Sequence, residues 1–472
     1  MNAERIDVDA AVIGGGHNGL TCAAYLAEAG RSVVVLERSE SLGGAARSER
    51  VFPDHDAQLS RYAYLVSLLP QLIVDELGLD VSLRRRPSNG DDELGALRTQ
   101  LAERVFPTMT KPLLGVDAFR RVVGDDDTWK DLIERPLGEM LERRVADDEV
   151  RGAVLTDGLI GSFTHAHDLQ ANRCFLHHVI GRGTGDWLLP VGGMGAVSSQ
   201  LAAAASRRSV ELRTDATVVG LSTDERRAIV RLGDGTTVKA RQAFANVAPA
   251  VLAGLLGSPL DGPPPEGAHV KVNLLLSRLP ELRSGARPED VFAGTFHVNE
   301  GYDQLEWAYR QAVAGRIPEV VPCEVYCHSL LDPSILSPAL QGAGAQTLTV
   351  FALHLPARLF RDDPAGRLRR AGDAILASLD SVLAKPIREC LLAPECVEVM
   401  GPLELEERLG LPGGHIYHGE LQWPFAEVPS DEGQWGVETR HGNVFICGAG
   451  ARRGGGVSGI PGRNAAMAAL DR

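Results

Sequence analysis

The chain has 472 residues and a formal net charge of −14; 44% of its residues are hydrophobic and 23% are charged. This length favours two domains over a single core. The negative charge argues against a nucleic-acid partner, because phosphate binding needs clustered positive charge. No apolar run is long enough to span a bilayer, so we expect no integral membrane segment.

The seven cysteines are an odd number without paired spacing, which predicts reduced thiols and a cytoplasmic location. Charged residues stand close to the first apolar run, so we expect no signal peptide. Cys323 and Cys327 are four positions apart, but no nearby histidine pattern completes a zinc site. We therefore expect no metal.

Residues 6–37 have the pattern of a strand, a glycine-rich turn, a helix and a second strand. Gly14, Gly16 and Gly19 form a G-x-G-x-x-G turn, and Glu37 follows the second strand. In this setting the motif predicts a dinucleotide site, with the pyrophosphate at the helix N-terminus and the acid on a ribose hydroxyl. The motif itself is common to NAD and FAD sites.

A second glycine-rich stretch, SLGGAAR, comes directly after the ribose acid. Gly43 and Gly44 allow another close approach of the backbone to a cofactor, and the alternative is a plain loop. By analogy with flavoprotein families, this glycine pair favours FAD over NAD.

The next part of the chain is predicted to be largely helical. Residues 62–79 predict a buried helix that is broken near Pro70. Residues 84–187 carry many helical signals and few strand signals. Four histidines fall inside this segment: His165, His167, His177 and His178. They lack a carboxylate pattern for a metal, so we interpret them as solvated or structurally satisfied.

Strand signals return after a glycine-rich helix start at residues 192–195. Residues 210–247 predict a β-meander with a tight turn at Asp234 and Gly235. The proline-rich residues 258–267 predict a linker. Beyond it, VKVNLLL and TLTVFAL predict strands of a second, mixed domain without a recognisable nucleophile motif.

The C-terminal residues 442–472 predict a strand, a glycine-rich turn and a closing helix. Such a turn lets backbone N–H groups reach another part of a flavin, where donors stabilise the reduced ring. All five tryptophans lie outside the nucleotide-binding stretches. This distribution suits an apolar substrate chamber, and ordinary core packing is the alternative.

Several stretches together resemble the phytoene desaturase-like FAD oxidoreductases. They are GGGHNG, the glycine pair after Glu37, PVGGMGAVSSQLAAA, GGHIYHGEL and CGAGARRGGGVSGIPGRNAA. The sequence is most similar to the branch of pyridine nucleotide-disulfide oxidoreductase domain protein 2, and more distantly to carotenoid isomerases and flavin amine oxidases. The resemblance covers the whole chain. It implies an α/β fold with a glutathione-reductase-type, Rossmann-like FAD-binding domain built from discontinuous segments, plus an α+β substrate domain.

The expected domain boundaries follow from this resemblance. The FAD-binding domain comprises residues 1–83, 188–262 (with the β-meander) and 439–472. Residues 84–187 form the helical part of the substrate domain, and residues 263–438 form its remainder.

The resemblance also implies which residues surround FAD. They are the turn glycines and the helix cap, the ribose acid with its neighbour, the stretch beside the flavin, a backbone contact to adenine and the C-terminal loop: Gly14, Gly16, Asn18, Gly19, Glu37, Arg38, Gly43, Gly44, Ala45, Ala46, Arg47, Val218, Gly448, Gly450, Gly456 and Val457. His418 matches a histidine of the family's GG-x-I-x-H segment. We expect it to act as the catalytic base, with a structural role as the alternative.

The expected reaction is desaturation or dehydrogenation of a largely apolar small molecule, with hydride transfer to the flavin and reoxidation by oxygen or another acceptor. Arg452 and Arg453 stand where carotenoid desaturases tend to have His-Pro, so a polyene substrate is not expected. The alternatives are C–N oxidation, as in flavin amine oxidases, and a non-redox flavin-binding isomerase or assembly protein. The sequence does not specify the oligomeric state.

Overall fold

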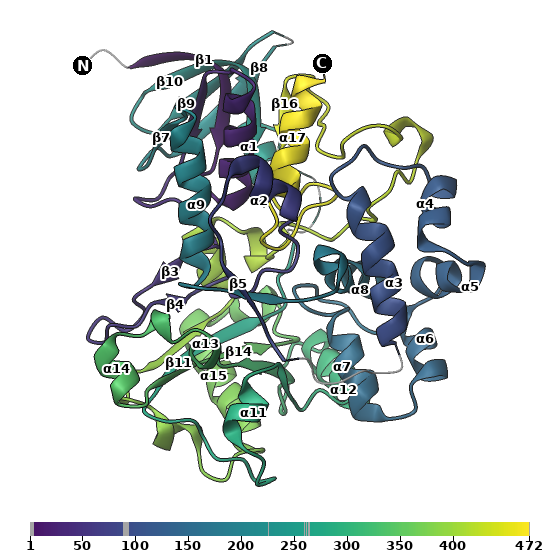
Figure 1. Cartoon of the computed structure of the whole chain (residues 1–472), viewed down its shortest axis with the longest axis vertical. Coiled ribbons are helices and arrows are strands. Elements are labelled where there is room, and N and C mark those ends of the chain that lie inside the picture. Colours follow the sequence, from purple (N-terminus) through teal and green to yellow (C-terminus); the bar gives the residue numbers. More distant parts are fainter. Residues whose placement is uncertain are drawn as a thin grey trace.

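Two large β-sheets, two short two-stranded sheets and a group of helices make up the fold (Figure 1). The computed structural model describes residues 4–87, 94–224, 226–258, 260, 262 and 265–471. The larger sheet has seven strands, which include the first and the last strand of the described chain, and the smaller has five strands. This confirms the α/β fold class, with a parallel sheet of the FAD-binding type and an antiparallel sheet in the second part.

The seven-stranded sheet has the order β7-β2-β1-β10-β9-β8, with β16 beside β10. Five strands are parallel: β1 (Arg5–Ile13), β2 (Val33–Leu36), β7 (Glu211–Arg213), β10 (Thr237–Ala245) and β16 (Val444–Ile446). β8 (Val218–Thr223) and β9 (Ala228–Leu232) are antiparallel. All four residues of β2 are buried, as expected for a central parallel strand.

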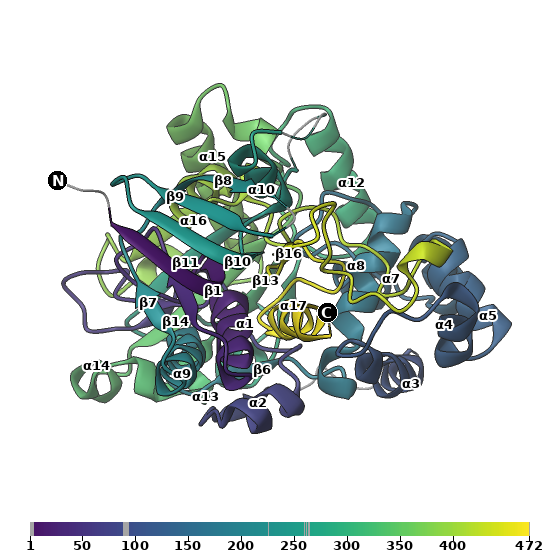
Figure 2. The ribbon, with the colours of Figure 1, turned by 90° about the horizontal axis from the view of Figure 1, so that it is seen from above.

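Three helices lie side by side on one face of this sheet (Figure 2). They are α1 (His17–Glu28), α9 (Met194–Arg207) and α17 (Ile460–Leu470). α1 and α17 pack so closely that a Cβ atom added to Gly462 would lie 2.1 Å from the carbonyl oxygen of Asn18. The two ends of the chain are thereby joined through a helix contact that has no room for a side chain.

The five-stranded sheet is antiparallel and has the order β12-β13-β14-β11-β15. Its strands are β11 (Val270–Leu276), β12 (Phe296–Val298), β13 (Cys323–Tyr326), β14 (Gln346–Ala352) and β15 (Val397–Met400). The helices of this part are α11 (Pro288–Phe292), α12 (Tyr302–Val313), α13 (His328–Leu331), α14 (Pro338–Gly342), α15 (Pro364–Asp380) and α16 (Pro402–Leu409). An apolar core joins its strands to α15.

The chain enters and leaves the helical region through two paired strands. β5 (Leu83–Arg85) pairs antiparallel with β6 (Leu188–Pro190), so the chain leaves and returns side by side. Between these strands lie α3 (Gly95–Val105), α4 (Val116–Val123), α5 (Asp126–Trp129), α6 (Leu137–Arg144), α7 (Asp148–Thr156) and α8 (Leu169–Val179). The expected helical character of this segment is confirmed, whereas the division of the chain into domains stays a prediction.

The predicted helix over residues 62–79 is wrong in its first half. α2 covers Gln71–Leu77, directly after Pro70, and the residues before it are not helical. Their backbone bonds to distant parts of the chain instead: the N–H of Ala63 donates to the carbonyl of Ala45, and Val66 pairs with Leu188. Tertiary hydrogen bonds therefore override the apolar pattern here.

Other expectations about local structure are confirmed. The tight turn at Asp234 and Gly235 joins β9 to β10, and α10 (Pro249–Leu255) follows. The predicted linker falls partly on residues 259, 261, 263 and 264, which lie outside the described residues. All seven cysteines are free and buried. Among the described residues, no helix is both long and apolar enough to cross a membrane.

The close contact between α1 and α17 yields a stability prediction. Replacing Gly462 with Ala should lower the free energy of unfolding by about 1–3 kcal/mol, because the new methyl group meets backbone that cannot move aside. Urea unfolding measures the change. Gly254→Ala, on the exposed face of α10 with open space around it, is the matched control and should be neutral or stabilising. Equal stability of the two variants would contradict the packing described.

Candidate functional site

A cavity of about 420 Å³ is lined by residues from both sheets and from the helical region. At one end lie the glycine turn after β1, the residues after β2 and the start of β8. At the other end lie side chains of β11, β13 and β14 together with residues of α8. One continuous space therefore connects the predicted nucleotide site with the second sheet.

The glycine turn brings backbone close to backbone. Gly14 has φ +101°, and a Cβ atom on Gly44 would lie 3.1 Å from the Cα of Gly16. α1 begins at this turn, and no side chain caps its N-terminus. Its first N–H groups are thus available to an anion, which is the chemistry required by a pyrophosphate.

Glu37 lies beside this turn at the end of β2 and is 8% exposed. Its carboxylate accepts hydrogen bonds of 2.8 Å from the backbone N–H groups of Gly15 and Ser39. It therefore positions the glycine turn as well as lining the cavity. The guanidinium of Arg38 donates to the carbonyls of Glu407 and Arg408 and so links the turn to α16.

The second glycine of the pair and the residues after it form another wall of the cavity. These residues are Gly44, Ala45 and Arg47. The Nη1 of Arg47 donates to Ser41, but its buried Nε has no hydrogen-bond partner among the described residues. The guanidinium lies 5.6 Å from the ring centre of Tyr62. A buried donor without a partner is costly, so Arg47 suits a ligand that brings an oxygen or nitrogen acceptor.

Of the predicted site residues, a majority line the cavity: Gly14, Gly16, Asn18, Glu37, Arg38, Gly44, Ala45, Arg47, Val218, Gly456, Val457 and His418. The others do not line it: Gly19, Gly43, Ala46, Gly448 and Gly450.

These supporting positions have packing roles. A Cβ atom on Gly19 would lie 2.2 Å from the carbonyl oxygen of Gly14, and the N–H of Gly43 bonds to the carbonyl of Gly15. Ala46 is part of the core. Their small size allows the cavity wall to close.

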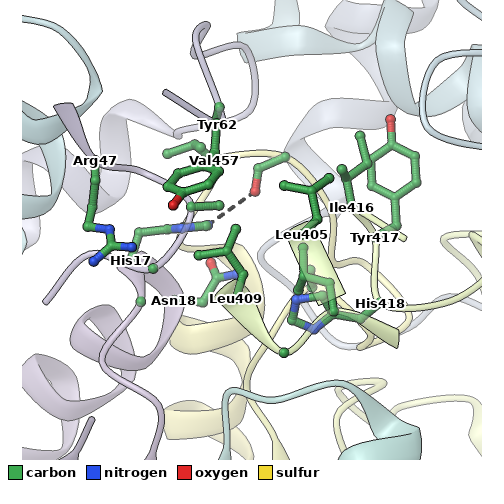
Figure 3. A pocket seen from close by; sticks show the side chains of 18 of the residues that line it. His17, Asn18, Arg47, Tyr62, Leu405, Leu409, Ile416, Tyr417, His418 and Val457 are labelled. Carbon is green, nitrogen blue, oxygen red and sulfur yellow. Dashed lines mark hydrogen bonds between the residues drawn. The ribbon is translucent and has the colours of Figure 1, made fainter. Parts of the chain in front are cut away.

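The C-terminal loop reaches the same space through Gly456 and Val457. The Nε2 of His17 lies 3.1 Å from the carbonyl oxygen of Gly456, and Figure 3 shows this contact beside Tyr62. Burial lowers the pKa of His17 to about 4, against the effect of this carbonyl. The imidazole is therefore neutral and donates its ring N–H to the loop.

His418 lies on the opposite side of the cavity, next to Ile416 and Tyr417 (Figure 3). Its backbone is left-handed, with φ +65°, and its buried Nδ1 has no hydrogen-bond partner. Burial, followed by the charges of His415 and His17, lowers the pKa of His418 to about 3. The ring is thus neutral, which is the form that accepts a proton.

His177 and His178 were interpreted from the sequence as structural, but both line the cavity. The Nε2 of His177 is buried without a partner, and a Cβ atom on Gly455 would lie 3.1 Å from it. His178 stacks on Trp187, with ring centres 5.1 Å apart, and its Nδ1 lies 2.8 Å from the carbonyl oxygen of Cys174. The sequence missed this pair because α8 reaches the C-terminal loop only in the folded chain.

The far end of the cavity is rich in aromatic rings. Tyr64 packs against Tyr326 and Phe351, with ring centres 5.1 Å and 5.8 Å away. Trp187 and Tyr417 also line the space. We call these five residues the aromatic chamber.

Two charged side chains of the second sheet reach this chamber. The Nζ of Lys271 donates to three backbone carbonyls, at 2.5 Å, 3.1 Å and 2.9 Å, and burial lowers its pKa to about 7. The carboxylate of Glu324 accepts a hydrogen bond from Tyr326, and burial together with the charge of Glu300 raises its pKa to about 7. All three donors of a charged Lys271 are therefore used, while Glu324 lines the cavity and its other oxygen has no hydrogen bond to a described residue.

Asn246 is a further residue that sequence reasoning missed. Its Nδ2 donates to the carbonyl of Gly14 at 3.1 Å. A Cβ atom on Gly16, Gly19 or Gly448 would lie within about 3 Å of the side-chain amide of Asn246. One feature of the sequence could have identified Asn246, namely its position directly after the strand β10. Side chains at the carboxyl ends of parallel strands meet at ligand sites.

The neutral state of His177 leads to a prediction about pH. Burial, and then His178, lowers its pKa to about 3, compared with 6.5 in an unfolded chain. Between these values the unfolded state binds more protons, so stability falls as the pH drops below about 6.5, by up to about 1.4 kcal/mol per unit. His177→Gln should flatten the pH dependence of the free energy of unfolding between pH 4 and pH 6.

The control for this experiment is His167→Gln, because His167 is exposed. It should keep the slope of the parent protein. If His177→Gln and the parent had the same slope, His177 would not be buried in its neutral form.

Comparisons with known proteins agree with this geometry. The model of the flavin-containing amine oxidoreductase family matches residues 19–271. An uncharacterised protein of Mycobacterium tuberculosis (strain H37Rv) is 45% identical, covering 100% of this chain and 98% of the relative. The mouse pyridine nucleotide-disulfide oxidoreductase domain-containing protein 2 is 27% identical, covering 98% and 93%.

A solved structure of putrescine oxidase bound to putrescine shares the fold, with a TM-score of 0.58 and 19% identity over 99% of this chain and 100% of that one. The family match covers more than half of the chain, and it implies FAD as the cofactor. The uncapped start of α1, the glycine turn and the unpartnered donor of Arg47 suit such a ligand. The chain belongs to the flavin-containing amine oxidoreductase family.

Proposed function

We propose that the protein is an FAD-dependent dehydrogenase that acts on a small molecule with a largely apolar body, as in the phytoene desaturase-like branch. The observation that carries this proposal is the continuity of one cavity from the glycine turn to the aromatic chamber. Such a space accepts a dinucleotide at one end and an apolar molecule at the other. The electron acceptor would be oxygen or another oxidant.

The proposed FAD contacts are the cavity-lining residues of the predicted set. The N-terminus of α1 would hold the pyrophosphate, and Glu37 would accept a hydrogen bond from a ribose hydroxyl. Arg47 would supply a donor to the flavin end. Bound FAD supplies a two-electron acceptor for the substrate's hydride.

His418 is our proposed proton acceptor. Burial lowers its pKa to about 3, so the ring is neutral near pH 7, and its buried Nδ1 has no hydrogen-bond partner among the described residues. Its low pKa makes it a weak base, so proton transfer would accompany oxidation of the substrate rather than precede it. Leu405, Leu409 and Ile416 line the cavity near His418 and would exclude water (Figure 3).

Oxidation of an amine is the second candidate. Glu324 places a buried carboxylate on the cavity wall beside Tyr326, an arrangement that suits an ammonium group. The fold likeness to putrescine oxidase agrees with this candidate. The carboxylate of Glu324 suits a charged amine but not an apolar molecule. One experiment that offers both kinds of substrate can therefore distinguish the two candidates.

The test is anaerobic mixing of the FAD-loaded protein with two panels, cyclic hydrocarbons and primary amines, while the visible absorbance of the flavin is followed. Bleaching by hydrocarbons supports the proposal. Bleaching by amines alone would replace it with the second candidate. If neither panel bleaches a flavin that dithionite reduces, the proposal fails, and a non-redox isomerase or assembly role becomes the better account.

Glu37 gives a direct test of the nucleotide site. Glu37→Ala removes the proposed ribose contact, the hydrogen bond to Gly15 of the glycine turn and the hydrogen bond to Ser39. Because a charged hydrogen bond contributes about 1.5–3 kcal/mol, FAD affinity should fall about 10- to 100-fold. Fluorescence titration of the apoprotein measures it. Glu28→Ala, at the exposed end of α1, should bind FAD normally. Unchanged affinity in Glu37→Ala would contradict this site.

His418→Asn tests the proposed proton acceptor. Asparagine tolerates the left-handed backbone at this position, so the loop should remain intact. We expect flavin reduction by substrate to slow about 100-fold while FAD content stays unchanged. Stopped-flow absorbance measures the rate. A normal rate would assign His418 a structural role.

A further inference from the structure

A histidine and two glutamates lie close together beside the aromatic chamber. They are His297, Glu300 and Glu324, and each offers a ligand atom within 4.8 Å of the others. His297 on β12 stands directly opposite Glu324 on β13, so both side chains are on one face of the sheet. Glu300 comes two residues after the end of β12. The strand register therefore creates this cluster from separated parts of the chain.

The cluster consists of two buried carboxyl groups and one imidazole. Glu300 is 1% exposed and Glu324 is 4% exposed. The Nδ1 of His297 lies 2.5 Å from one oxygen of Glu300, and Tyr326 donates to one oxygen of Glu324. Two buried carboxyl groups therefore share one imidazole. Burial of an uncompensated charge is costly.

A second observation points to a missing ligand. The Oε1 of Glu300 is fully buried and has no hydrogen-bond partner among the described residues. Buried carboxylate oxygens are normally paired, so an atom in this state marks a place for a cation. Neither Glu300 nor Glu324 forms a salt bridge to a lysine or arginine in the part of the chain that the structure describes.

We propose that His297, Glu300 and Glu324 bind a divalent first-row metal ion such as Zn²⁺ or Mn²⁺. One imidazole and two carboxylates are ligands that these ions share, whereas Mg²⁺ and Ca²⁺ prefer oxygen alone. The metal would take the place of the hydrogen bond between His297 and Glu300. Bond lengths of about 2.0–2.2 Å require these two side chains to separate by less than about 1 Å.

The position of Glu324 gives the site a link to the chamber. Three protein ligands leave a fourth position open in tetrahedral coordination. Because Glu324 lines the cavity, this position would be filled by water or by a polar group of the substrate. His297, whose side chain is 26% exposed, provides a route for the ion from solvent. A bound metal would also occupy the carboxylate that the amine candidate needs.

The test uses FAD-loaded protein that has been treated with a chelator and dialysed. Zn²⁺ and Mn²⁺ are titrated separately by calorimetry, and bound metal is counted by mass spectrometry. We expect one ion per chain. Glu300→Gln and Glu324→Gln should each weaken binding at least tenfold, because each amide keeps an oxygen for the present hydrogen bond but loses the charge. No substrate is needed, so the result is independent of the proposed reaction.

Glu142→Gln is the matched control. Glu142 forms a His–Glu pair with His167 at 3.0 Å, but without a third ligand, and this variant should bind metal like the parent. Absence of metal uptake by the parent would overturn the proposal. So would equal uptake by the parent and both cluster variants.

Discussion

The structure depends on the close approach of three backbone loops around Asn246. Its amide donates to the carbonyl of Gly14, and Gly16 and Gly448 leave no room for side chains beside it. These loops follow β1, β10 and β16, three neighbouring parallel strands. Their carboxyl ends meet at one edge of the sheet, and small residues there keep the start of α1 open to a ligand.

This constraint explains why distant segments build one site. α17 must pack against α1 without a side chain at Gly462, and the loop before it then reaches the cavity through Gly456. The same loop contacts His17 and His177 from two sides. The nucleotide end is therefore fixed by backbone geometry. The chamber end consists of side chains, so substrate choice can change there without altering the cofactor site.

The sequence predicted the parts of the molecule that local patterns govern. The glycine turn, Glu37 and the closing helix follow from spacing alone, and these elements lie where expected. The apolar pattern of residues 62–70 predicts a helix. It does not reveal the hydrogen bonds that these residues form with distant parts of the chain, and these bonds prevent the helix. His177 was missed for a related reason, since its place in the cavity depends on how α8 packs.

The second sheet shows the same limit of local patterns. Lys271 and Glu324 lie in apolar strands, where a charged residue has no spacing that marks it as part of a site. Their roles arise from register and burial, which only the folded chain fixes. His297 and Glu324 face each other because β12 and β13 pair in one particular register.

Whether the cavity beside the glycine turn binds FAD can be measured on the purified protein itself. The purified protein is examined by visible absorption, and the cofactor released on denaturation is identified by mass spectrometry. The account predicts a yellow protein that releases about one FAD per chain. A colourless protein that does not take up added FAD, or one that releases a nicotinamide dinucleotide, would contradict it.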